Sequence, residues 1–173
     1  MPAHLHILTT GGTIDKVYFD AKSAFEVGTP LVADILEAAG VGFAYEVEVL
    51  FQKDSLEITE EERRFIGRRA RDCGARCVLV THGTDTMADT ARVVSDVLGP
   101  DSDTTVVFVG SLTPARFKAS DAEFNVGFAV AAAQTLPPGV YVAMNGQAFS
   151  AGTVRKNREQ NRFEPVSEPI TPA

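Results

Sequence analysis

The sequence predicts an α/β fold, a three-layer sandwich in which helices cover both faces of a mainly parallel sheet. Short apolar runs that fit buried strands alternate with segments that have the hydrophobic period of a helix. Three runs are apolar, apart from His6 in the first, as expected of strands covered on both faces: residues 5–8, 77–80 and 106–109. Alternation of this kind predicts right-handed parallel crossovers.

Each element has its own local signal. The expected strands cover residues 5–8, 43–50, 77–80, 106–109 and 140–144, and the expected helices cover residues 30–39, 60–73, 87–98 and 120–134. Thr29-Pro30 is typical of an N-cap followed by proline at the first helical position. Thr59 with Glu62 and Ser120 with Glu123 fit capping boxes. Gly40 and Gly74 are expected to end helices.

Two segments carry neither helical nor strand period. Residues 15–28 predict a long loop, which in a compact domain is usually functional or disordered, and we expect a mobile lid there. Residues 140–144 are the last clear strand. The polar stretch from Asn145 onward, with prolines at 165, 169 and 172, is expected to wrap the surface or to be partly loose. The phenylalanines at 117, 124 and 128 are expected in the core.

Composition excludes several classes of function. The 173 residues suit one domain, and the formal net charge of −7, without a long Lys/Arg run, argues against a nucleic-acid or anionic-membrane partner. No run of 18 apolar residues and no secretory leader pattern is present, so we expect no membrane span. Cys73 and Cys77 fit reduced thiols in a cytoplasmic protein. No metal or organic cofactor is implied.

Two glycine-bearing turns carry the chemistry. Thr10-Gly11-Gly12-Thr13 follows the first strand, and His82-Gly83-Thr84-Asp85 follows the third. Because the carboxyl ends of parallel strands form the ligand edge of an open α/β sheet, we expect these turns and the loop at Asp54-Ser55 to lie along one edge. Acyl transfer needs a nucleophile, a base and oxyanion donors. Thr13 is the hypothetical nucleophile, and backbone N–H groups of the turns are the hypothetical donors.

The motifs resemble those of a known family. Thr10-Gly11-Gly12-Thr13-Ile14 and His82-Gly83-Thr84-Asp85-Thr86-Met87 are similar to the two signature motifs of the bacterial-type L-asparaginases. The resemblance continues through Lys53-Asp54-Ser55, Gly110-Ser111-Leu112-Thr113-Pro114, and Ala143-Met144-Asn145 to Lys156. It implies a flavodoxin/Rossmann-like asparaginase N-terminal domain spanning residues 1–173, in a short form of the family that lacks the usual second, C-terminal domain.

The resemblance also implies an activity and its residues. These enzymes are threonine-dependent amidohydrolases that convert L-asparagine to L-aspartate and ammonia through an acyl-enzyme. The carried-over catalytic roles are nucleophile for Thr13, activating lid tyrosine for Tyr18, second threonine for Thr84, α-ammonium holder for Asp85 and catalytic lysine for Lys156. The carried-over substrate contacts are Gly12, Asp54, Ser55, Gly83, Thr84 and Asp85. An Asp85 carboxylate favours the ammonium form of Lys156, so we expect Lys156 to polarise Thr84 or relay a proton rather than act as a free base.

Several alternatives stay open at this point. Thr13 could be a turn residue, Asp85 a helix cap, Tyr18 a surface aromatic and Lys156 a solvated charge. Glutamine could be the substrate in place of asparagine, because one methylene changes discrimination by only about 1–3 kcal/mol. A non-catalytic amino-acid-binding module is the alternative outside enzymes. In the two-domain enzymes a neighbouring subunit supplies a further acidic residue, which no position here replaces. A homodimer or homotetramer is expected.

Overall fold

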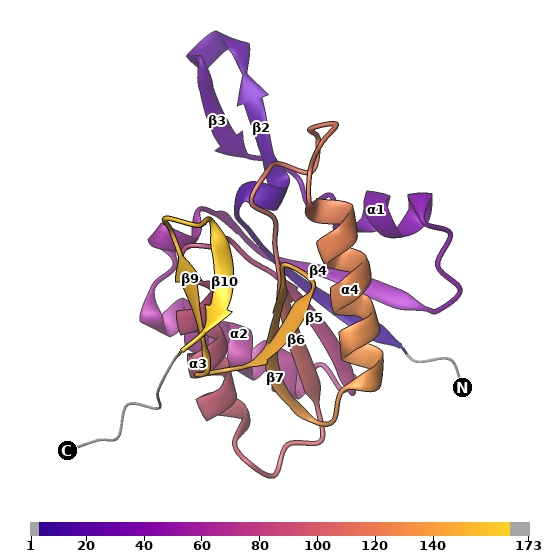
Figure 1. Cartoon of the computed structure of the whole chain (residues 1–173). Helices are drawn as coiled ribbons and strands as arrows, with labels where there is room; N and C mark the ends of the chain where they lie inside the picture. The colour runs from indigo at the N-terminus through magenta and orange to yellow at the C-terminus, as the bar shows by residue number, and fades with distance from the viewer. Residues whose placement is uncertain (1–3, 167–173) are drawn as a thin grey trace, which may run out of the picture.

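A computed structural model describes residues 4–166 and confirms the predicted α/β fold. One sheet has the strand order β4-β1-β5-β6-β7-β8, in which the first five strands are parallel and β8 is antiparallel to β7 (Figure 1). Its strands are β1 (Leu5–Gly11), β4 (Tyr45–Lys53), β5 (Cys77–Thr81), β6 (Thr105–Val109), β7 (Gly139–Met144) and β8 (Gln147–Ser150). The helices are α1 (Val32–Ala38), α2 (Glu60–Asp72), α3 (Met87–Leu98) and α4 (Ala122–Thr135).

Helices cover both faces of the sheet, but one crossover differs from the prediction. Arg69 of α2 binds Glu48 on one face, and α3 packs beside α2, whereas Thr105 on the other face donates to the Leu136 carbonyl at the end of α4. The chain moves in the same direction from β5 to β6 to β7, yet α3 and α4 lie on opposite faces. The β6–α4–β7 crossover therefore has the opposite hand to β5–α3–β6, and the expectation of uniformly right-handed crossovers is wrong. The seven-residue α1 alone would leave most of that face uncovered, and α4 covers it.

The segment expected to lack structure is a β-hairpin. Strands β2 (Lys16–Phe19) and β3 (Ala24–Val27) pair antiparallel and project from the body of the molecule (Figure 1). Its aromatic side chains pack on one another, with ring centroids 5.2 Å apart for Tyr18 and Phe25 and 6.0 Å apart for Phe25 and Phe117. The prediction that Phe117 and Phe124 are core residues is wrong, because both are exposed.

Two predicted helix starts are also wrong. Helix α1 begins at Val32 after Leu31, which makes no side-chain cap, so Thr29 and Pro30 lie before the helix. Ser120 does not form a capping box with Glu123; its hydroxyl donates to the Thr113 carbonyl and accepts from the Ala122 amide. The box at Thr59 and Glu62 is confirmed at the start of α2.

The chain after Asn145 is more ordered than expected. Strand β8 extends the main sheet, and β9 (Val154–Asn157) pairs antiparallel with β10 (Arg162–Pro165). Pro165 lies in β10, whereas Pro169 and Pro172 fall outside the described residues. Within residues 4–166, no helix has the length and apolar character needed to cross a bilayer.

Asp15 closes the base of the β2–β3 hairpin. Its backbone carbonyl accepts from the Gly28 amide at 2.8 Å, and its Oδ1 accepts from the Leu31 amide at 2.9 Å. The residue is buried, and its Oδ2 has no hydrogen-bond partner in the described part of the chain. Burial raises the pKa of Asp15 to about 7, with the Leu31 amide and Arg116 acting in the opposite direction.

Asp15→Asn should change how stability depends on pH. The folded pKa of Asp15 exceeds its unfolded value, so the native state binds more protons between about pH 4 and 7 and its free energy of unfolding falls as pH rises through that window. Asparagine keeps a carbonyl acceptor for Leu31 without titrating. We expect the free energy of unfolding of the variant, relative to wild type, to rise between pH 4 and 8 by at most about 4 kcal/mol.

Urea unfolding at several pH values measures this difference. Asp20→Asn, at an exposed site in the same hairpin, is the control and should leave the pH profile of wild type unchanged. A difference between Asp15→Asn and wild type that is constant from pH 4 to 8 would contradict the linkage.

Candidate active site

The two glycine turns touch through their backbones. Gly12 has φ 90°, a conformation that side chains rarely adopt, and a Cβ added there would overlap the Gly83 Cα and backbone nitrogen. The Gly12 amide also donates to the Lys53 carbonyl at 2.9 Å. The ends of β1, β4 and β5 therefore meet at one point, which places Thr13 and Thr84 on the same edge of the sheet.

Lys156 joins the second turn from more than seventy residues away. Its Nζ donates to Thr84 Oγ1 and to Asp85 Oδ1, both at 2.8 Å. Thr84 is buried and the Lys156 side chain is only 15% exposed, whereas the Asp85 side chain is 37% exposed. The Lys156 ammonium thus donates to the Thr84 hydroxyl oxygen, which accepts through one lone pair, while the Asp85 carboxylate stays accessible to solvent.

A hairpin positions Lys156. In the β9–β10 pair, Lys156 lies directly opposite Phe163, so the two side chains share one face. Phe163 is fully buried in the core, and its amide donates to Asn145 Oδ1 at 2.8 Å. Burial of Phe163 therefore directs the Lys156 side chain towards the sheet edge, whereas the neighbouring Arg155 points outward and pairs with Glu164 at 2.7 Å.

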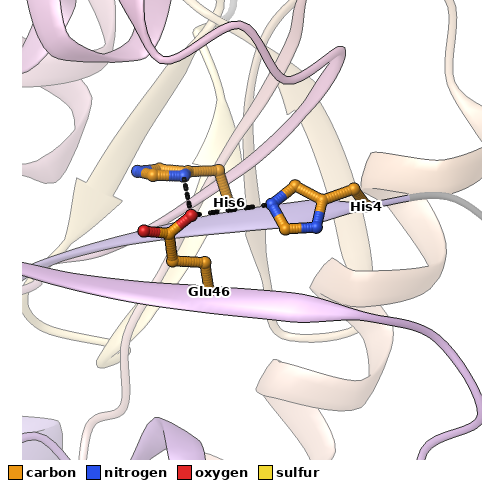
Figure 2. Close-up of side chains that lie close together, drawn as sticks. All are labelled: His4, His6 and Glu46. Atoms are coloured by element: carbon orange, nitrogen blue, oxygen red, sulfur yellow. Dashed lines mark ion pairs between the residues drawn. The ribbon is translucent and has the colours of Figure 1, made fainter.

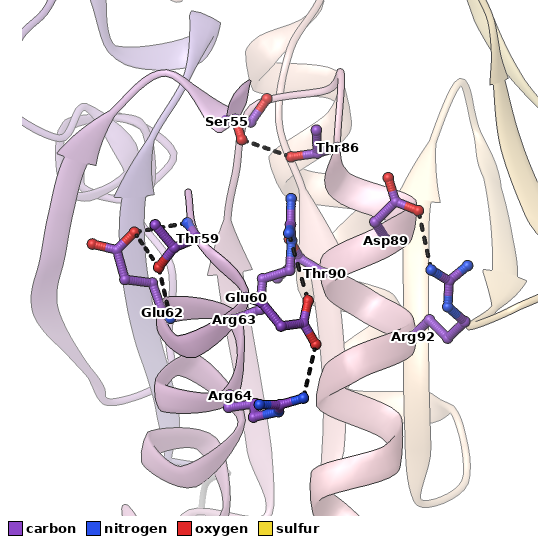
Figure 3. A network of polar contacts seen from close by, with 10 residues as sticks. All are labelled: Ser55, Thr59, Glu60, Glu62, Arg63, Arg64, Thr86, Asp89, Thr90 and Arg92. Carbon is purple, nitrogen blue, oxygen red and sulfur yellow. Dashed lines mark hydrogen bonds and ion pairs between the residues drawn. The ribbon is translucent and has the colours of Figure 1, made fainter. Parts of the chain in front are cut away.

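The loop after β4 packs against the second turn. Ser55 is buried, and a Cβ on Gly83 would lie 2.7 Å from the Ser55 Cβ. Thr86 Oγ1 donates to the Ser55 carbonyl at 2.8 Å, and the capping box of α2 holds the next residues of the loop (Figure 3). Asp54 faces elsewhere: its Oδ1 caps Leu56 and its Oδ2 accepts from Lys16 Nζ at 3.1 Å.

Arg63 of α2 donates to Thr90 Oγ1 of α3 at 3.2 Å, which ties the two helices together immediately below these loops (Figure 3). The loop after β6 is fixed separately. Asp121 accepts from the amides of Leu112 and Thr113, and the Ala115 amide donates to the Ile14 carbonyl beside Thr13. Four strand ends are thus joined around the turns by contacts between backbones and side chains.

Tyr18 is not brought to Thr13. Thr13 is half-buried in a single 3-10 turn, Thr13–Asp15, whereas Tyr18 is 51% exposed on the projecting hairpin and packs against Phe25 with the rings tilted. The role of Tyr18 therefore requires the hairpin to move. The sequence reasoning missed Lys16, which balances the Asp54 charge, and Arg158, whose guanidinium lies 4.0 Å from Asp85; neither position carries a local signal.

His82 is a structural residue of the second turn. Its ring is fully buried, and Nδ1 lies 2.8 Å from the Gly83 carbonyl, so Nδ1 carries the proton and Nε2 is left without a partner in the described chain. Burial lowers the pKa of His82 to about 4. A neutral, inaccessible imidazole cannot exchange protons with a substrate at the surface, so the role of His82 is to hold the turn.

A cavity of about 830 Å³ lies on the outer side of the Lys156 group, between α3 and β9. Thr84, Asp85 and Lys156 line it together with residues of α3, such as Arg92, and of the strand β9, such as Arg155. Thr13 does not line this cavity.

Comparison of the chain with known proteins identifies the family to which it is similar. The family model "Asparaginase, N-terminal" matches residues 4–170. The chain is 32% identical over 174 residues to the L-asparaginase of Thermococcus kodakarensis, covering 95% of this chain and 52% of that protein. It is 31% identical to the glutaminase-asparaginase of Acinetobacter glutaminasificans, covering 87% of this chain and 48% of that protein.

The solved structure of the thermostable L-asparaginase from Thermococcus kodakarensis superimposes with a TM-score of 0.81 at 30% identity, covering 96% of this chain and 52% of that one. The chain thus spans about half the length of the curated relatives it matches. The family match, the strand order and the two contacting threonine turns agree with one another. The chain belongs to the asparaginase family and corresponds to its N-terminal domain.

Proposed function

We propose that this chain is an amidohydrolase that converts L-asparagine to L-aspartate and ammonia through an acyl-enzyme on Thr13. The observation that supports this most is the Lys156 ammonium, which donates to both Thr84 Oγ1 and Asp85 Oδ1 at 2.8 Å. A pure binding site for an amino acid has no need of a buried lysine aimed at a threonine hydroxyl. Contact of Gly12 with Gly83 supplies the second requirement, a second hydroxyl on the same edge.

The reaction proceeds in two steps. Thr13 Oγ attacks the amide carbon; when the hairpin closes, the Tyr18 oxygen accepts the Thr13 proton and the Tyr18 hydroxyl gives its own proton to the leaving nitrogen, so that the C–N bond breaks and ammonia departs. Water then attacks the ester carbon, releases aspartate and returns the proton to Thr13. Backbone N–H groups of the glycine turns stabilise the oxyanion, and loss of one such donor typically lowers the rate about 10²–10³-fold.

Different groups of the site bind the two charged ends of the substrate. Asp85 is exposed enough to accept the α-ammonium group, while the loop at Ser55, with Lys16 balancing Asp54, faces the α-carboxylate. The Lys156 ammonium polarises Thr84, which orients the water or relays the proton. Relatives named glutaminase-asparaginase favour glutamine as the second candidate substrate.

The proposal also covers the extent of the active domain, its assembly and its location. We propose that residues 1–173 form a single domain that catalyses the reaction by itself, associates as a homodimer or homotetramer, and works in the cytoplasm. Light scattering on purified protein tests the association, and the activity assays below, made on this chain itself, test the sufficiency of the domain.

Thr13→Ala should abolish turnover and leave the fold intact. Removal of the nucleophile is expected to lower kcat for asparagine by at least about 10³-fold, while circular dichroism and thermal unfolding stay close to wild type. Thr135→Ala, in which a threonine at the far end of α4 is removed, is the matched control and should keep full activity. Intact-mass analysis of acid-quenched wild-type enzyme should show an aspartyl adduct on the peptide containing Thr13.

A near-normal rate in Thr13→Ala would show that Thr13 is not the nucleophile and would assign that role to Thr84. Binding of asparagine by wild-type protein without release of ammonia would instead favour the binding module. Ammonia release on both asparagine and glutamine, measured side by side, decides between the two substrates, and we expect asparagine to be preferred.

Lys156→Met should act on kcat more than on KM. The change removes the donor to Thr84 Oγ1 and the partner of Asp85, so the chemical step loses its polarising charge, and a fall in kcat of about 10²-fold is expected. Arg155→Met changes the neighbouring, outward-facing cation of the same strand and should leave both constants near wild type. Equal effects of Lys156→Met and Arg155→Met on kcat would contradict a specific role of Lys156 in the chemical step.

A further inference from the structure

Two strands present four chemically distinctive side chains on one face at the amino end of the sheet. His4 and His6 are two residues apart at the start of β1, and Glu46 and Glu48 are two residues apart on the edge strand β4. His6 and Glu46 are direct partners in the parallel ladder. Because side chains repeat every two residues along a strand, all four point to the same face.

Three of these side chains converge. The Oε2 atom of Glu46 lies 3.8 Å from His4 Nε2 and 3.7 Å from His6 Nδ1 (Figure 2). One ligand atom from each of the three residues lies within 4.8 Å of the others. Neighbouring ligand atoms around a tetrahedral zinc ion are about 3.4 Å apart, given bonds of about 2.0–2.1 Å. The two distances to Glu46 exceed this spacing by 0.3–0.4 Å, and the widest separation in the group, up to 4.8 Å, exceeds it by up to about 1.4 Å, which rotation of the exposed His4 and Glu46 side chains can close.

The fourth side chain fixes the orientation of His6. Glu48 Oε2 lies 3.0 Å from His6 Nε2, and the same carboxylate accepts two hydrogen bonds from Arg69, both at 2.9 Å. A carboxylate only accepts, so Nε2 carries the proton and the lone pair of Nδ1 faces Glu46. A lone pair aimed at a carboxylate repels it unless a proton or a cation lies between them.

We propose that His4, His6 and Glu46 bind a divalent transition metal ion, with zinc as the best match. Two imidazoles and one carboxylate form a ligand set that zinc accepts, with water in the fourth position. Glu48 accepts the hydrogen bond from His6 Nε2, as carboxylates commonly do for histidines that bind a metal through their other ring nitrogen. Thr13 follows His6 by seven residues and lies beyond the carboxyl end of β1, so the site is about 20 Å away at the opposite end of the strand and the ion has no part in the amide chemistry. It would instead tie the start of β1 to the edge strand β4.

Zinc binding to tag-free protein tests the proposal. Isothermal titration with ZnCl₂ should show saturable binding of one ion per chain in wild type. Glu46→Gln and His4→Gln should each weaken it at least tenfold; both side chains are more than half exposed, at 64% and 51%, so neither substitution threatens the fold. Glu26→Gln, which removes an exposed carboxylate on the β2–β3 hairpin, is the matched control and should bind zinc like wild type.

The two cysteines need a control of their own. His4 also lines a surface hollow with Cys73 and Cys77, and free thiols bind zinc. Cys73→Ser/Cys77→Ser should retain the site, and Co²⁺ added to wild type should give visible d–d bands without a near-ultraviolet thiolate charge-transfer band. Loss of binding in the double serine variant, with binding retained in Glu46→Gln, would overturn the proposal.

Thermal unfolding provides a readout that does not depend on enzymatic activity. Zinc should raise the Tm of wild type and Glu26→Gln, because a ligand that binds only the folded state stabilises it, and should leave the Tm of Glu46→Gln unchanged. Absence of saturable binding and of any Tm shift in wild type would mean that a proton alone bridges His6 to Glu46, and the metal site would be rejected.

Discussion

The contact between Gly12 and Gly83 is the constraint on which the site depends. Both residues stand where a Cβ would strike neighbouring atoms, Gly12 against the backbone of Gly83 and Gly83 against Ser55. A Cβ would lie 2.4 Å from the Gly83 backbone and 2.7 Å from the Ser55 Cβ, so side chains at these points would displace the strand ends by up to about an ångström, and a displacement of that size can lower an enzymatic rate about 10²-fold. The two glycines therefore set the spacing of Thr13 and Thr84. The parallel pairing of β1 with β5 keeps the ends of these strands in register.

The apolar strands and the motifs predicted most of this arrangement, and the failures share one cause. Buried runs such as residues 77–80 identify the strands without help from distant residues. The β9–β10 hairpin is held by Phe163 in the core and by Asn145, and the β2–β3 hairpin is pinned by Asp15 to Gly28. These contacts are non-local, so a local period could not reveal them. The placement of α4 has a non-local cause too: it packs on the sheet face that the seven-residue α1 is too short to cover.

The candidate residues divide in the same way. Thr84, Asp85 and Lys156 were predicted from motif resemblance, and the structure brings their side chains within hydrogen-bonding distance. Tyr18 was predicted by the same route, yet its position relative to Thr13 depends on how the hairpin lies, which no motif encodes. The partnership of Lys16 with Asp54 spans 38 residues and has no sequence signature at all.

The hairpin can serve Thr13 only by bending at a restricted place. Asp15 is held by Gly28 and Leu31, so the base of the hairpin is fixed beside Thr13. Motion that carries Tyr18 inward must therefore occur beyond that base, within β2 and β3. It must exchange the tilted contact of the Tyr18 and Phe25 rings for a contact with substrate or Thr13. An exposed aromatic pair is a small barrier of about 1 kcal/mol, which a bound amino acid can offset. Burial raises the pKa of Asp15 to about 7, whereas the Leu31 amide favours the ionised carboxyl, so ionisation strengthens this hydrogen bond and the base of the hairpin stays the fixed end of any such motion.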